Sequence, residues 1–161
     1  MSQAADLLDT ARARKLRLAA AESCTGGLVA AAITDIPGSS DVFERGFVTY
    51  SNAAKVEMLG VLRETLDTHG AVSEEVASEM ARGAVARSGA EIAVAITGIA
   101  GPGGSETKPE GRVCFALAGP SGVRAETREF GPQGRAEVRA AATAHALHLL
   151  QEAVAGAPDQ P

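Results

Sequence analysis

Residues 16–27 read Leu-Arg-Leu-Ala-Ala-Ala-Glu-Ser-Cys-Thr-Gly-Gly, and this stretch predicts a buried strand that leads directly into a helix. The short apolar run Leu16–Ala21 is typical of a buried strand, and Glu22-Ser23 ends it. Thr25-Gly26-Gly27 then opens a helix that extends to about Thr34. A strand followed at once by a helix is the repeating unit of α/β sheets.

The rest of the chain continues this alternation of helices and strands. Apolar periodicity and capping residues predict helices, and short apolar runs predict strands. The Gly119–Gly122 turn between the last two strands indicates a hairpin. We therefore predict a three-layer α/β/α sandwich with a mixed, mostly parallel sheet, as one domain over 1–156 with a frayed tail over 157–161. The predicted helices cover 3–15, 53–59, 63–69, 74–88 and 135–155, and the strands cover 43–50, 90–96, 112–118 and 124–130.

Composition restricts the possible location of the protein. The chain has 161 residues, of which 45% are apolar and 22% charged, enough for one ordinary core. The longest apolar stretches are too short to span a bilayer, so no membrane segment is predicted. Residues 1–15 carry four charges before Lys15 and lack the apolar core of a signal peptide. These features predict a cytoplasmic protein.

Charge and cysteine usage restrict the possible ligands. A net charge of −5 and only 3% aromatic residues argue against binding to nucleic acid. Cys24 and Cys114 stand far apart without CxxC partners, and His145 and His148 have no carboxylate or thiolate pattern around them. We expect no disulfide, no metal site and no cofactor. The expected ligand is a small molecule, and a homo-oligomer is compatible with the sequence, which does not determine the oligomeric state.

Ser23 is the first candidate for chemistry. It lies where the first strand passes into a helix, the place where open α/β sheets bind ligands. Free N–H groups at the helix start could hold a developing oxyanion while the serine attacks a carbonyl. The alternative is that Ser23 or Thr25 only caps the helix. Cys24 is a rival nucleophile, or else a small buried apolar residue.

Lys55 is the candidate base in the segment Tyr50-Ser51-Asn52-Ala53-Ala54-Lys55. Ser51-Asn52 is a plausible helix cap, so Lys55 would lie one turn into that helix and could point back to the end of the preceding strand. The chain offers no convincing histidine for Ser23, and a partly desolvated lysine can take its proton. The alternative is an ordinary solvated lysine.

A third segment, Thr97-Gly98-Ile99-Ala100-Gly101-Pro102-Gly103-Gly104, directly follows a predicted strand. It lacks the Gly-Lys-Ser/Thr ending of a P-loop, so ATP hydrolysis is not supported. Its backbone could still surround a phosphate or a carbonyl oxygen, although a flexible connector is the alternative.

Together these segments resemble the C-terminal domain of the competence/damage-inducible CinA family, which includes stand-alone nicotinamide-nucleotide amidases. The resemblance rests on Glu-Ser-Cys-Thr-Gly-Gly, Tyr-Ser-Asn-x-x-Lys, Gly-Ala-Val-Ser and Thr-Gly-Ile-Ala-Gly-Pro-Gly-Gly in this order. It covers most of the chain. It implies the sandwich fold derived above and hydrolysis of nicotinamide mononucleotide to nicotinate mononucleotide and ammonia.

The resemblance also implies roles for residues. Glu110 and Arg112 depart from the small or apolar residues usual after Lys108-Pro109, which puts the substrate contacts of that loop in question. The matching positions are Ser23 as nucleophile, Lys55 as base, and Tyr50 and Thr97 as further active-site residues. For substrate binding we predict Thr25, Gly26, Gly27, Gly98 and Gly101, with Arg135 and Arg139 assigned to the phosphate.

Two other functions fit the same sequence. One is a nucleotide-binding regulatory module that keeps the pocket and catalyses nothing. The other is an amidase for a carboxamide that is not a nucleotide.

Overall fold

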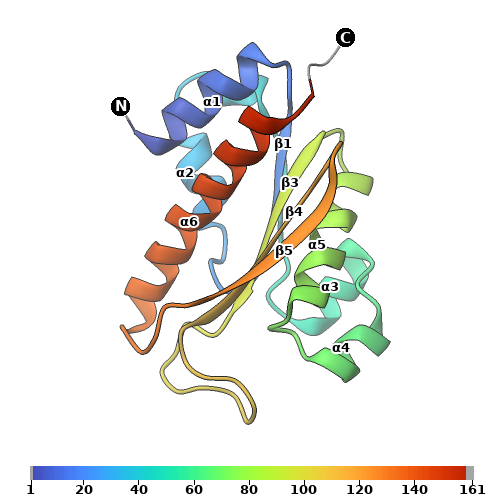
Figure 1. Cartoon of the computed structure of the whole chain (residues 1–161), viewed down its shortest axis with the longest axis vertical. Coiled ribbons are helices and arrows are strands. Elements are labelled where there is room, and N and C mark those ends of the chain that lie inside the picture. The colour runs from blue at the N-terminus through green and yellow to red at the C-terminus, as the bar shows by residue number, and fades with distance from the viewer. Residues whose placement is uncertain (1, 159–161) are drawn as a thin grey trace.

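A five-stranded sheet in the order β2-β1-β3-β4-β5 forms the middle layer of the protein (Figure 1). The computed structural model describes residues 2–158. β1 pairs in parallel with β2 and β3, whereas β4 pairs antiparallel with β3 and β5. β4 is therefore the one described strand that runs against the others, and the predicted mixed sheet is confirmed. The strands are β1 (Leu18–Glu22), β2 (Phe43–Val48), β3 (Ile92–Gly98), β4 (Arg112–Gly119) and β5 (Gly122–Glu129).

Helices cover both faces of this sheet and complete the three predicted layers (Figure 1). One face carries α1 (Gln3–Ala13), α2 (Leu28–Thr34) and α6 (Arg135–Gly156), and a short 3-10 turn (Ser39–Asp41) precedes β2. The other face carries α3 (Asn52–Leu59), α4 (Arg63–His69) and α5 (Glu74–Ala86).

The two faces of the central strand β3 differ in side-chain size. Ile92, Val94 and Ile96 belong to the core under α6, whereas Ala93 and Ala95 belong to the core under α5. This alternation follows from the two-residue period of a strand. On the alanine side α5 also packs closely on α3: a Cβ at Gly83 would lie 2.0 Å from the Leu59 carbonyl oxygen. A side chain at this position would therefore separate the two helices.

The chain ends differ from prediction. The first helix stops at Ala13, before the predicted 15, because Lys15 has a left-handed backbone with φ 58°. The predicted frayed tail began at 157. Instead, Ala157 is buried, and its carbonyl accepts a hydrogen bond from Arg14. Burial of this last apolar residue against the core holds the segment, while residues 159–161 of the predicted tail lie outside the described residues.

The carboxyl ends of β1, β2 and β3 lie at the same edge of the sheet, because all three strands run in the same direction. The three segments singled out above, residues 22–27, 50–55 and 97–104, lie at or just after these strand ends. Within residues 2–158, no helix is both long and apolar enough to cross a membrane.

Candidate active site

Ser23 and Lys55 meet at the end of β1. Ser23 directly follows the strand, and its N–H donates to the Ile96 carbonyl of β3 at 3.0 Å. Ser51 caps α3 by accepting from the Ala54 N–H, so that Lys55 projects back toward the sheet from the first turn. The Lys55 Nζ lies 3.1 Å from the Ser23 Oγ. The structure thus brings the two residues into hydrogen-bond contact.

Lys55 is almost completely buried, with 1% of its surface exposed. Besides Ser23, its Nζ donates to the Thr49 carbonyl at 3.0 Å. Burial lowers the pKa of Lys55, because the charged ammonium loses its hydration; the nearby Cys24 thiol acts in the opposite direction. The alternative of a solvated lysine is therefore wrong. This environment favours the neutral amine that a general base requires.

The carboxylate of Glu22 caps the start of α2, a role that the sequence analysis missed. Its buried carboxylate accepts from the Thr25 hydroxyl at 2.6 Å and from the N–H groups of Gly27, Val29 and Ala30 at 3.2, 3.0 and 2.9 Å. The Glu22 side chain therefore caps the helix, and neither the Ser23 hydroxyl nor the Thr25 hydroxyl accepts from its N–H groups. An acidic residue a few positions before a helix start was the available signal.

An oxyanion could be stabilised only by backbone N–H groups of residues 24–27 that do not already donate to another acceptor. Gly26 donates to the Ser23 carbonyl at 3.0 Å, and Gly27 donates to Glu22. Thr25 is fully buried. The Cys24 N–H donates to no other residue in the described chain, and Cys24 lines the pocket beside Ser23. The N–H groups of Gly26 and Gly27 are thus already occupied, whereas the N–H of the preceding Cys24 is open beside the pocket.

The two arginines of α6 have separate environments. Arg139 donates to the carbonyls of Cys24 at 3.0 Å and Thr25 at 3.3 Å, and it does not line the pocket. It holds the backbone of residues 24–25 beside Ser23, so its expected role at the phosphate is revised. Arg135 does line the pocket, where it donates to the Gly101 carbonyl at 2.7 Å and to the Tyr50 hydroxyl at 2.6 Å.

A pocket of about 360 Å³ lies in front of Ser23, within the size range of small-ligand sites. Thr97, Gly98 and Gly101 line it, as do Tyr50 and Lys55. Thr97 is buried, and its hydroxyl donates to the Ala71 carbonyl at 2.9 Å. The structure therefore gathers all four predicted catalytic residues and the glycine segment at one pocket.

The chemistry of Cys24 differs from that of a reactive thiol. Burial raises its pKa to about 11, with a smaller opposing effect from the charge of Arg139. Cys24 is thus protonated at neutral pH, although it borders the serine. Within residues 2–158, no group of three or more His, Cys, Asp or Glu side chains could hold a metal ion.

Both the sequence and the fold of this chain are similar to those of known proteins. The sequence model of the CinA C-terminal domain matches residues 1–154. The nicotinamide-nucleotide amidohydrolase PncC of Escherichia coli is 57% identical over 140 residues, which cover 86% of this chain and 85% of that protein. The competence damage-inducible protein A of Klebsiella pneumoniae has a similar structure, with a TM-score of 0.92, 38% identity and 97% of each chain covered.

Other relatives are much longer than this chain. A CinA-like protein of Chlorobium phaeobacteroides is 60% identical over 121 residues, which cover 73% of this chain but only 29% of that protein. The chain spans about a third of the length of several such curated relatives.

Proposed function

The chain belongs to the CinA C-terminal domain family, and from this membership we propose that it hydrolyses the carboxamide of nicotinamide mononucleotide to nicotinate mononucleotide and ammonia. The observation that carries the proposal is the 3.1 Å contact between Ser23 and a buried Lys55 at a pocket of ligand size. The high identity to the Escherichia coli amidohydrolase supports the choice of substrate. The cytoplasmic location remains a prediction from the sequence.

The first half of the reaction forms an acyl-enzyme. The neutral amine of Lys55 takes the proton of Ser23, and the serine oxygen attacks the carboxamide carbon. The second contact of the amine, to the Thr49 carbonyl, leaves its lone pair free for Ser23. The carbonyl oxygen becomes an oxyanion near the Cys24 N–H. The carbon–nitrogen bond then breaks as Lys55 returns the proton to the amide nitrogen, which leaves as ammonia.

The second half restores the enzyme. A water molecule gives a proton to Lys55 and attacks the acyl carbon, and the bond to the Ser23 oxygen breaks when that oxygen regains the proton. Arg139 keeps the nucleophile turn in place through the carbonyls of Cys24 and Thr25. Arg135 is the arginine that lines the pocket, so it is the candidate partner of the substrate phosphate.

A substrate panel tests the function and separates it from the alternatives. We expect ammonia release from nicotinamide mononucleotide with a kcat/KM at least about a hundredfold above that for the nucleoside without phosphate or for nicotinamide, because a phosphate–arginine contact is lost in both. Equal rates for all three would indicate a general amidase. A raised thermal midpoint with the mononucleotide, but no ammonia, would indicate a regulatory binding module.

Removal of metal ions is expected to leave the rate unchanged. The proposed nucleophile and base are side chains, and the serine–lysine route needs no Lewis acid. The protein would be dialysed against a chelator and assayed in metal-free buffer beside an untreated sample. Activity that disappears and returns with one divalent ion would contradict this mechanism.

A further inference from the structure

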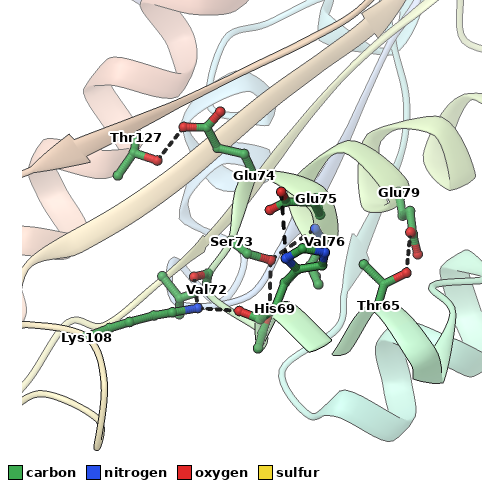
Figure 2. A network of polar contacts seen from close by, with 11 residues as sticks. Thr65, His69, Val72, Ser73, Glu74, Glu75, Val76, Glu79, Lys108 and Thr127 are labelled. Atoms are coloured by element: carbon green, nitrogen blue, oxygen red, sulfur yellow. Dashed lines mark hydrogen bonds and ion pairs between the residues drawn. The ribbon is translucent and has the colours of Figure 1, made fainter. Parts of the chain in front are cut away.

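Four consecutive carbonyls, from the last residue of α4 to the start of α5, each accept a hydrogen bond from a side chain. The Lys108 ammonium donates to the His69 carbonyl at 2.6 Å and to the Val72 carbonyl (Figure 2). Between them, the Ser73 hydroxyl donates to Gly70 at 2.8 Å, and the Thr97 hydroxyl donates to Ala71 at 2.9 Å. The backbone of residues 69–72 is therefore held by side chains.

Glycine at position 70 makes room for the lysine. Its backbone is left-handed, with φ 80°, and a Cβ added there would lie 3.0 Å from the Lys108 Nζ. A larger residue would press on the ammonium and would strain the turn. The close approach of the Lys108 ammonium to these carbonyls therefore depends on the glycine at position 70 as well as on the lysine.

Lys108 belongs to the loop 99–111, which is braced within itself. The Gly111 N–H donates to the Ile99 carbonyl at 2.7 Å and closes the neck of the loop. The Lys108 backbone is tied to Ser105 by two hydrogen bonds of 2.9 and 3.1 Å. In the described part of the chain, the side chain of Lys108 makes the only side-chain hydrogen bonds from this loop to residues 69–73.

Both of the segments that Lys108 joins line the pocket. Ile99–Gly103 come from the loop, and Ala71 and Val72 come from the connection between α4 and α5. We propose that Lys108 is a positioning residue that fastens these two walls to each other and so maintains the substrate pocket. The inference rests on the proposed function, because its kinetic test uses that reaction. Lys108 does not itself line the pocket, so it acts through the walls and not on the substrate.

The consequence differs from the loss of a catalytic group. Ser23 and Lys55 are held by β1, α3 and Thr49, whereas the described hydrogen bonds of Lys108 go to His69, Val72 and Ser105. Without the lysine, the two walls separate while the reacting groups keep their geometry. Contacts with the substrate that are equal in the ground state and the transition state are then lost, which raises KM and leaves kcat nearly unchanged.

Lys108→Met tests this inference, because methionine keeps the length of the side chain and removes the ammonium. We expect KM for nicotinamide mononucleotide to rise about tenfold, with kcat within about threefold of the wild-type value. Lys108→Arg retains the charge and several donors, and it should recover part of the lost affinity. Lys15→Met is the matched control, since Lys15 is exposed beyond α1 at the other end of the sheet.

Hydrogen exchange supplies a readout that does not depend on activity. In Lys108→Met, amides of residues 69–73 and 99–111 should exchange faster than in the wild type, while those of β1 and β3 stay protected. Wild-type KM together with wild-type exchange in Lys108→Met would overturn the inference, as would a fall in kcat with unchanged KM. If the wild type itself releases no ammonia, the proposed function fails, and the exchange result alone decides the role of Lys108.

Discussion

Ser23→Ala is expected to reduce ammonia release by a factor on the order of 10⁴ or more, because the missing oxygen is the atom that attacks the carboxamide. The fold should survive. The side chain is small, and its described hydrogen bond is the contact with Lys55, whose loss costs about 1 kcal/mol. Ammonia release would be measured beside thermal unfolding and substrate binding, which should change little.

Cys24→Ala is the matched control for this variant, since it removes the neighbouring thiol, the rival nucleophile, from the same turn. We expect it to keep most of the activity, because the Cys24 thiol has a pKa of about 11 and is not ionised at neutral pH. The backbone N–H of residue 24, which is the proposed oxyanion donor, is retained by alanine. Near-normal turnover in Ser23→Ala and none in Cys24→Ala would transfer the nucleophile role to the cysteine.

The meeting of Ser23 and Lys55 could be anticipated from the chain because both positions follow from local rules. A strand that ends at Ser23 and a helix that starts after Ser51 place the two residues at the carboxyl ends of neighbouring parallel strands. The depth of burial could not be anticipated in this way. The burial of Lys55 depends on how several distant segments pack around it. The local sequence around a lysine in a helix does not predict this packing.

The errors in the predicted site come from contacts that span long stretches of sequence. Arg139 reaches the Cys24 carbonyl across 115 positions, and no periodicity on α6 separates it from Arg135, which lines the pocket. The role of Glu22 is an exception, because its contacts are local in sequence. The glycines after it suggested free N–H groups at the helix start, but the Glu22 carboxylate accepts the N–H groups of Gly27 and Val29. A backbone N–H group is available to a ligand only if no side chain of the protein already accepts its hydrogen bond.

Lys55→Arg is expected to be nearly as damaging as Lys55→Ala, with kcat reduced by a factor on the order of 10³ in both. Arginine supplies a positive charge with a similar reach, but it stays protonated at any usable pH and cannot accept the proton of Ser23. Binding of the mononucleotide, measured by calorimetry, should persist in both variants. If Lys55 served only to attract the phosphate, arginine would restore turnover and alanine would mainly raise KM.

The pH dependence of the wild-type rate gives the same assignment an independent check. The base is active when neutral, so kcat should rise with pH through the pKa of Lys55 in the substrate complex. Burial lowers this pKa from the ordinary 10.5, and the rising limb should therefore lie below 10.5. The limb should be absent from any residual activity of Lys55→Arg and Lys55→Ala, because neither side chain titrates there. A limb of the same midpoint in either variant would assign it to another group and would leave Ser23 without its proposed base.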